Sequence, residues 1–223
     1  MAKPSENDHL IVFGRYPRVG EVKTRLIPAL GPAGAAAFQK RLTEKTMATA
    51  RKTAVQRTAR LVFCHEGGSE QQIRKWLGGK GLCLAAQAGG NLGRRLQLSM
   101  KSAFDEGACK VVLIGTDIPG ITTTILNAAF DALNNHDLVL GPSTDGGYWL
   151  VGLSKPENIF TGIAWSTADV TSQTLALARK NKLTPHLLDP LADLDTPEDL
   201  ARGMDHRHTA APYLSIIIPT MNA

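Results

Sequence analysis

Several features are scarce or absent in this 223-residue chain, and each absence excludes a class of protein. Cysteine occurs only at Cys64, Cys83 and Cys109, with no Cys-X-X-Cys pair, so neither a disulfide framework nor a zinc site is expected. We expect these cysteines to be buried thiols. No apolar run approaches the roughly 20 residues that cross a bilayer, and the polar start, Met1 to Asp8, has no apolar leader segment. The chain is therefore expected to be cytoplasmic and to have no membrane span.

Aromatic residues are also scarce, at 5%, and the basic residues are scattered along the chain. Because nucleic-acid-binding proteins combine a basic patch with stacking aromatics, nucleic acid is not the expected partner. Phosphorylated small molecules explain the net charge of +5 equally well. With 43% hydrophobic and 20% charged residues, the composition is that of an ordinary globular domain.

Short apolar runs alternate with helical patterns along most of the chain. The runs that start at His9 and Lys110 are almost continuously apolar and end at a glycine, as in strands buried on both faces. Further strands are expected at 60–64, 82–86, 138–140 and 148–153, and helices at about 31–58, 70–77, 92–104, 123–133 and 197–202. This alternation predicts an α/β fold with a mostly parallel central sheet and helices on both faces. In such sheets, ligands bind outside the carboxyl ends of the strands.

One domain is expected over residues 9–203. Residues 204–212 have the composition of a linker, and residues 213–223 begin a new apolar strand just as the sequence stops. That last strand either closes the edge of the sheet or is the first strand of a second, truncated domain.

The loop that follows the first strand, residues 14–25, is the first candidate binding site. Gly14 would let the backbone approach an anion, and Lys23 and Arg25 would supply charge-assisted hydrogen bonds to phosphate oxygens. The loop matches neither the P-loop nor the dinucleotide-binding pattern. An ordinary basic loop that leads into a helix is the alternative, and the position at a strand end favours binding.

Acidic residues at other strand ends are candidate metal ligands. Asp117 follows the strand that starts at Lys110, and Mg²⁺ or Mn²⁺ would suit it, because Mg²⁺ binds one or two carboxylates and takes phosphates and water as its other ligands. Asp193 or Asp195, just ahead of the last helix, could complete the site. The alternative for all three residues is the stabilisation of a turn or a helix cap.

The loop at residues 141–149 is the third candidate. It combines the carboxylate of Asp145 with Gly146 and Gly147, which would let a sugar or base approach the backbone, and with Tyr148 or Trp149, either of which would stack on that ligand. A tight hairpin with its aromatic residues in the core is the alternative, and the sequence leaves both open.

Six short motifs, taken in order, resemble one protein family. They are Val22-Lys-Thr-Arg-Leu26, Gly90-Asn-Leu-Gly93, Gly115-Thr-Asp-Ile-Pro119, Gly141-Pro-Ser-Thr-Asp-Gly-Gly-Tyr148, Trp165-Ser-Thr167 and Asp193-Leu-Asp-Thr-Pro-Glu-Asp-Leu200. The family is the bacterial glycosyltransferase-A-like (GT-A) family linked to arsenosugar biosynthesis, in the nucleotide-diphospho-sugar transferase superfamily. Its relatives include 2-phospho-lactate and molybdenum-cofactor guanylyltransferases. The resemblance covers residues 10–200 and implies a GT-A type fold.

The resemblance also implies an activity: Mg²⁺-assisted transfer from a nucleotide or nucleotide-sugar donor to a small-molecule acceptor. Lys23 and Arg25 would hold the donor phosphates. Lys23 and Asp117 would be the catalytic residues, and Asp117 would hold the metal together with Asp195 or Asp193. Asn91 departs from the family pattern, in which an aspartate is expected, and so removes one carboxylate from the edge of the site.

Two reactions and one inactive alternative fit this resemblance. The basic pair favours nucleotidyl transfer. The family and the last apolar run, which resembles the first strand of an inverting family 2 glycosyltransferase, favour glycosyl transfer and a fusion protein. The alternative is a nucleotide-binding or scaffold domain, fused to a glycosyltransferase, that has lost turnover, which Asn91 permits.

Overall fold

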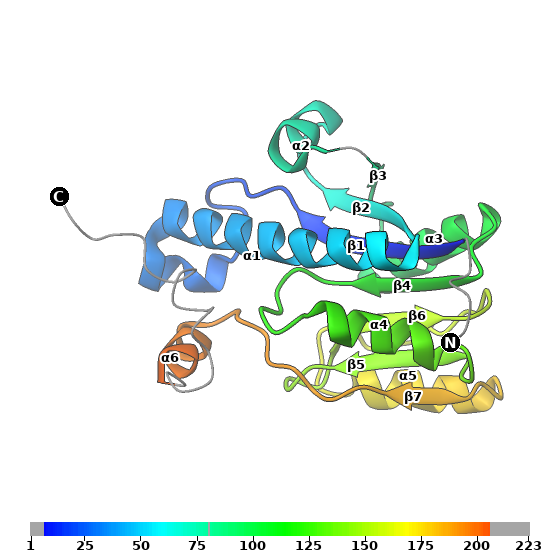
Figure 1. The fold of residues 1–223 in the computed structure, drawn as a ribbon. Helices are drawn as coiled ribbons and strands as arrows, with labels where there is room; N and C mark the ends of the chain where they lie inside the picture. Colours follow the sequence, from blue (N-terminus) through cyan, green and yellow to red (C-terminus); the bar gives the residue numbers. More distant parts are fainter. Residues whose placement is uncertain (1–6, 80, 206–223) are drawn as a thin grey trace.

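A computed structural model describes residues 7–79 and 81–205 of the chain (Figure 1). Its seven strands form one sheet in the order β3-β2-β1-β4-β6-β5-β7. They are β1 (Asp8–Arg15), β2 (Arg60–Glu66), β3 (Leu82–Ala86), β4 (Lys110–Ile114), β5 (Leu138–Pro142), β6 (Tyr148–Leu153) and β7 (Pro185–Leu187). β6 runs antiparallel to its neighbours β4 and β5, and the other pairs are parallel. The mostly parallel sheet is thus confirmed.

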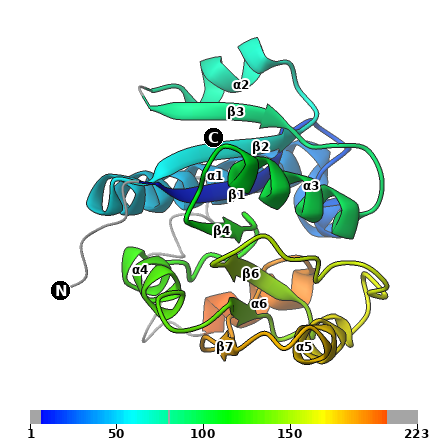
Figure 2. The ribbon, with the colours of Figure 1, turned by 90° about the vertical axis from the view of Figure 1, so that its right-hand side faces the viewer.

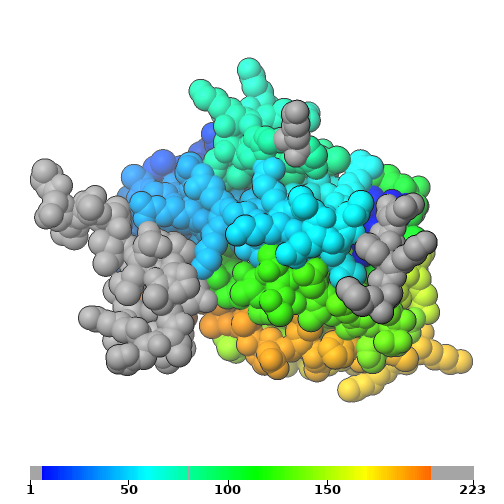
Figure 3. Space-filling view, in the orientation of Figure 1, coloured from blue at the N-terminus to red at the C-terminus, as the bar shows by residue number. Residues whose placement is uncertain are grey.

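Helices cover both faces of the sheet, as predicted. They are α1 (Ile27–Arg57), α2 (Glu70–Leu77), α3 (Leu92–Asp105), α4 (Thr123–Ala132), α5 (Val170–Lys180) and α6 (Pro197–Asp205), and a 3₁₀ turn, η1 (Thr24–Leu26), precedes α1. α1 and α4 lie on one face and α3 and α5 on the other (Figure 2). Seen from the side of Figure 1, α1 crosses the molecule as a continuous blue-to-cyan band with α4 beneath it (Figure 3).

The central strands are apolar on both faces because each face has its own core. Leu10 and Val12 of β1 belong to the core under α1 and α4, whereas Ile11 and Phe13 belong to the core under α3. Each fully buried side chain of this size stabilises the fold by about 1.5–3 kcal/mol. The two cores fix the carboxyl ends of β1 and β4, from which the first two candidate loops emerge.

The first long helix starts earlier than the sequence suggests. α1 begins at Ile27 rather than near Gly31, and Gly31 interrupts it with a φ of 68°. A proline is tolerated in the first turn of a helix, where its missing N–H has no partner to lose. Pro28 therefore fits a short first helical segment, and the chain changes direction at Gly31.

Two elements had not been predicted, α5 and β7. β7 is a three-residue edge strand that begins with a proline and is not fully buried, so it shows no alternating pattern. α5 buries only the narrow stripe Val170, Thr174 and Ala178.

The predicted start of α6 is confirmed. The Thr196 hydroxyl accepts a hydrogen bond from the backbone N–H of Asp199 at 3.2 Å, and the Asp199 carboxylate accepts one from the N–H of Thr196 at 2.8 Å. The helix runs on to Asp205, into the predicted linker. The rest of that linker and the apolar strand at 213–223 lie outside the described residues.

The cysteine prediction holds only in part. Cys64 is buried, Cys83 is half-buried, and Cys109 is exposed, so the expectation of a buried thiol is wrong for Cys109. In residues 7–79 and 81–205, no helix combines the length and the apolarity that a bilayer crossing requires.

Candidate functional site

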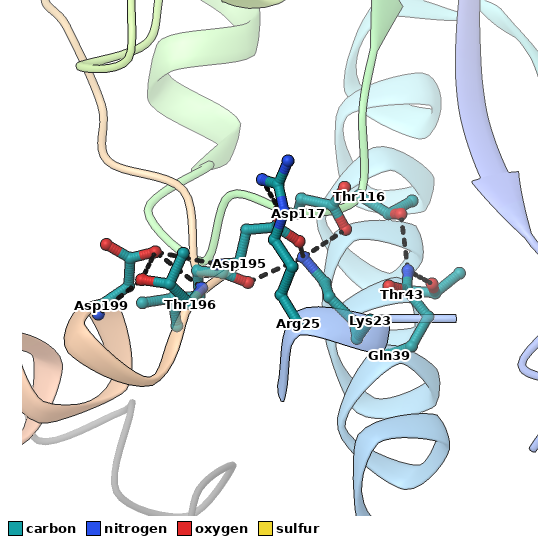
Figure 4. Close-up of polar contacts among 10 residues, drawn as sticks. Lys23, Arg25, Gln39, Thr43, Thr116, Asp117, Asp195, Thr196 and Asp199 are labelled. Atoms are coloured by element: carbon teal, nitrogen blue, oxygen red, sulfur yellow. Dashed lines mark hydrogen bonds and ion pairs between the residues drawn. The ribbon is translucent and has the colours of Figure 1, made fainter. Parts of the chain in front are cut away.

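Lys23 is the centre of the candidate site. Its backbone adopts a left-handed conformation, with a φ of 46°, and its side chain is only 2% exposed. The Lys23 ammonium donates a hydrogen bond to the Leu194 carbonyl at 2.7 Å, and it lies 3.1 Å from Asp117 Oδ1 and 3.4 Å from Asp195 Oδ1. One buried cation thus joins the loop after β1, the loop after β4 and the segment ahead of α6 (Figure 4).

The two carboxylates differ in their other contacts. Asp195 Oδ2 accepts a hydrogen bond from the Arg25 guanidinium at 2.8 Å. The Asp117 side chain is 53% exposed, so it is open to a ligand, while its backbone carbonyl accepts a hydrogen bond from the Leu194 N–H at 3.2 Å. The structure therefore brings Lys23, Arg25, Asp117 and Asp195 together, as the sequence analysis expected.

Further polar residues hold this cluster in place, and two of them, the buried Gln39 and Thr43, were not singled out from the sequence. Gln39 of α1 donates hydrogen bonds to the hydroxyls of Thr116, at 3.2 Å, and Thr43, at 3.3 Å. Asp199 Oδ2 accepts the N–H of Asp195 at 3.2 Å. No local signal in the sequence distinguishes Gln39 and Thr43 from the other polar residues of α1.

Asp193, the alternative metal ligand, is near enough to Lys23 for the lysine charge to favour its ionised form, but it makes no ion pair with Lys23 in the described residues. No ion pair to Asp193 is found in the described part of the chain. Burial, and after it the charge of Asp145, raises the pKa of Asp193 above its ordinary value. Asp195 is therefore the better placed of the two candidates.

The side chains of the third candidate loop, residues 141–149, make contacts within the protein. Asp145 Oδ1 accepts hydrogen bonds from the Ser143 hydroxyl at 2.5 Å and from the Gly147 N–H at 3.0 Å. Gly146 has a φ of 91°, and a Cβ there would overlap the backbone of Ala168. Tyr148 packs edge-on against Trp165, with 6.2 Å between ring centroids, and burial raises its pKa. These contacts favour the hairpin alternative that the sequence left open.

A cavity of about 200 Å³ lies beside the Lys23 loop, between the ends of β1 and β2. Its lining includes Arg15, Tyr16, Arg18, Glu21 and Glu66. Gly68 makes room for Tyr16, since a Cβ there would come within 2.7 Å of that ring. Gly14 is one of the residues expected to bind substrate. It packs under Phe63, because a Cβ on Gly14 would lie 2.6 Å from the Phe63 ring.

Glu66 links this cavity to α3. Its carboxylate pairs with Arg15 at 2.7 Å and with Arg95 at 2.9 Å. Burial opposes ionisation of Glu66, but the hydrogen bonds and charges of the two arginines outweigh it and hold its pKa below the ordinary value. Asn91, where the family pattern has an aspartate, accepts the N–H of Arg94 at 2.9 Å and caps α3. The amide thus keeps the capping role without the charge.

The cluster fits a hard divalent cation through two carboxylates and no more. No group of three or more His, Cys, Asp or Glu side chains that could hold a metal ion occurs within 7–79 and 81–205. Mg²⁺ typically takes one or two carboxylates and leaves its other positions to phosphates and water. Asp117 and Asp195, which share one ammonium, match that ligand set.

The fold is that of the nucleotide-diphospho-sugar transferases. A "putative nucleotide-diphospho-sugar transferase" from Desulfovibrio desulfuricans G20 is 31% identical and superposes with a TM-score of 0.84, over 96% of this chain and 93% of that one. A 4-diphosphocytidyl-2C-methyl-D-erythritol synthase from Anaerococcus prevotii DSM 20548 is 11% identical, with a TM-score of 0.59 over 94% and 99% of the two chains. A nucleotidyl transferase from Methanothermobacter thermautotroptrophicus is 12% identical, also at 0.59, over 91% and 98%. The last two share the fold alone.

The chain belongs to the family described as "Uncharacterized protein conserved in bacteria (DUF2064)", whose model matches residues 49–167. No curated protein is similar enough to the chain to match it.

Proposed function

We propose that this chain is a nucleotide-dependent transferase, which moves a nucleotidyl or glycosyl group from a nucleotide donor to a small acceptor with the help of Mg²⁺ or Mn²⁺. The observation that carries the proposal is the buried Lys23 ammonium between Asp117 and Asp195, on the same loop that lines a cavity at the ends of β1 and β2. Ligands of open α/β sheets bind at such strand ends.

The cavity beside Lys23 would hold the nucleoside part of the donor. Tyr16 offers a ring on which a base can stack, and Arg15 and Arg18 in the same walls pair with Glu66 and Glu21. Lys23 and Arg25 follow on the same loop, so they would reach the donor phosphates.

The cations of the site are neutralised by its own carboxylates. Lys23 contacts Asp117 and Asp195, and Arg25 contacts Asp195. A divalent cation on these carboxylates would supply charge stabilisation to the donor phosphates. Lys23 and Arg25 would then exchange a carboxylate partner for a phosphate partner. Metal and nucleotide should therefore bind cooperatively, because each removes the competitor of the other.

Nucleotidyl transfer is the reaction that this charge arrangement favours. In that reaction the acceptor attacks the α-phosphate of a nucleoside triphosphate, the bond to the β-phosphate breaks, and pyrophosphate leaves with the developing charge. In glycosyl transfer the acceptor attacks the sugar carbon, and a nucleoside diphosphate leaves. Four basic residues on one loop, Arg15, Arg18, Lys23 and Arg25, suit the more highly charged donor.

A thermal-shift panel of the four nucleoside triphosphates and of nucleotide sugars, each with and without Mg²⁺, tests the proposal. A ligand that binds only the native state raises its apparent stability. We expect a metal-dependent shift with a triphosphate, followed by pyrophosphate release when acceptors are added. A metal-dependent shift with nucleotide sugars alone would move the assignment to glycosyl transfer. Binding without turnover under any acceptor would support the scaffold alternative.

The same proposal extends to the chemical class of the acceptor. The resemblance to a family linked to arsenosugar biosynthesis makes a sugar-containing acceptor the first class to assay. Sugars, sugar phosphates and other hydroxylated acids would be offered in parallel, with pyrophosphate and nucleoside diphosphate release both recorded.

A further inference from the structure

A second cavity, of about 300 Å³, lies between α3 and the segment that follows β6. This volume is at the lower end of the range for small-molecule sites, so it suits a ligand of monosaccharide size and is too small for a folded partner. Its walls include Asn91, Arg94, Gln97, Leu98, Phe160 and Trp165. None of these residues takes part in the Lys23 cluster.

The aromatic wall of this cavity is fixed by close packing. The rings of Phe160 and Trp165 stack with 6.5 Å between centroids, and Trp165 meets Tyr148 edge-on. Gly93 lets this wall approach α3, because a Cβ there would come within 2.5 Å of Trp165 Nε1 and 2.8 Å of the Phe160 carbonyl. The cavity is therefore part of the packed structure, and an apolar ligand face would find a rigid surface.

Two polar side chains in the lining could form a further hydrogen bond or ion pair. Gln97 Nε2 donates to the Glu157 carbonyl at 3.4 Å, which orients the amide, yet no donor within the described residues reaches the buried Gln97 Oε1. The Arg94 guanidinium has no ion pair in the same part of the chain, whereas its neighbour Arg95 pairs with Glu66. A hydroxyl group would satisfy the amide oxygen, and an anionic group would pair with the arginine.

The cavity and the Lys23 cluster lie on opposite faces of the sheet at the same strand ends. Trp165 packs on Tyr148, the first residue of β6, and the next residue, Trp149, accepts the N–H of Gly115 at 3.0 Å. Gly115 leads directly to Asp117. A ligand in the second cavity would therefore approach the end of β4 from the face opposite to Lys23.

From these contacts we infer that the second cavity binds the acceptor, a small anion that carries a hydroxylated ring, such as a sugar phosphate. The inference rests on the proposed transferase function, since an acceptor requires a donor. Trp165 would cover the apolar face of the ring, Gln97 would accept a hydroxyl hydrogen, and Arg94 would pair with the anion.

The indole N–H signal of Trp165 in a ¹H–¹⁵N NMR spectrum tests this assignment on the full chain. The chain has three tryptophans, so Trp76 and Trp149 serve as internal controls, and Trp165→Phe identifies the signal. Three probes would be titrated without nucleotide: glucose 1-phosphate, methyl glucoside and inorganic phosphate. We expect a saturable movement of the Trp165 signal with glucose 1-phosphate, and at least roughly tenfold weaker binding of the other two probes.

Two variants sharpen the test. Arg94→Gln should weaken glucose 1-phosphate binding about tenfold, whereas the matched control Arg74→Gln, on the exposed side of α2, should leave it unchanged. Gln97→Leu should weaken both ring-bearing probes and leave inorganic phosphate unaffected.

The outcomes separate this inference from the proposed function. Failure of all three probes to move the Trp165 signal, with metal-dependent nucleotide binding intact, overturns the acceptor cavity and leaves the transferase proposal in place. Equal binding of inorganic phosphate and glucose 1-phosphate overturns the part played by the ring. A Trp165 response in a protein that no nucleotide stabilises contradicts the proposed function instead.

Discussion

Two strand-end loops look alike in the sequence and differ in the structure. The Lys23 loop and the 141–149 loop both combine glycine with charged residues. Lys23 contacts Asp117 after β4 and two partners 171 and 172 residues away, in the segment ahead of α6, whereas Asp145 finds its partners two residues away. An acid whose lone pairs are taken by its own turn stabilises that turn. Charged residues brought together from distant segments have been positioned by the whole fold, and they form the candidate site.

The glycines of the 141–149 loop support the same conclusion. In the 141–149 loop, Gly146 has a positive φ and lies against Ala168, and Gly141 lies under Trp149, whose ring would be 2.6 Å from a Cβ. These glycines make room for the protein's own atoms. They are therefore explained without a ligand.

The largest effect should come from Gly146→Ala. The new Cβ would overlap the backbone of Ala168, and the residue would hold a left-handed φ of 91°, so we expect a loss of about 3 kcal/mol or more in the free energy of unfolding. Chemical denaturation measures this loss. Nucleotide binding should survive under conditions where the variant is folded, and a folded variant of wild-type stability would contradict the structural role.

A matched pair of aspartate variants compares the two loops directly. Asp117→Asn should weaken metal-dependent nucleotide binding about 10- to 100-fold and leave the fold intact, because its carboxylate is exposed and serves the site. Asp145→Asn should leave nucleotide binding unchanged and lower the melting temperature by a few degrees, because it weakens the turn. Thermal shift with and without Mg²⁺ reads both effects. Reversed results would place the site in the 141–149 loop.

A smaller effect should come from the paired ions formed by Glu66 with Arg15 and Arg95. Since the folded-state pKa of Glu66 lies below its ordinary 4.5, the pair stabilises the fold above about pH 4.5 and loses this contribution as the pH falls further. The groups are partly exposed, so the contribution should stay below about 1 kcal/mol. The difference in melting temperature between wild type and Glu66→Gln should therefore shrink on acidification. A difference that grows would contradict the pairing.

The fold could be predicted from the sequence wherever a strand or helix has an unbroken run or stripe of buried residues. The apolar runs of β1 and β4 are almost continuous, and the apolar residues of α3 recur every four residues. Each pattern therefore predicts one type of element. β7 could not be predicted, because an edge strand of three residues with a proline buries too few side chains on either face to form a pattern. Likewise, α5 buries few residues and mixes them with threonine.

The residues of the candidate site were singled out from the sequence, but their arrangement was not. The sequence indicated Lys23, Arg25, Asp117 and Asp195, yet it gave equal weight to Asp193. The left-handed turn that points Lys23 inward depends on the loop conformation, and the Gln39–Thr116 contact depends on how α1 packs. Neither is encoded in a local pattern, so only the structure could supply them.

We propose that Lys23 occupies the place on Asp117 and Asp195 that a divalent cation would take when the donor binds. The most direct test is the affinity for Mn²⁺ alone, measured by electron paramagnetic resonance of the free ion, in wild type, in Lys23→Met and in the control Lys40→Met. Lys23→Met removes the competing charge and should bind Mn²⁺ about tenfold more tightly, while Lys40→Met should match wild type. Equal or weaker Mn²⁺ binding by folded Lys23→Met would contradict the account.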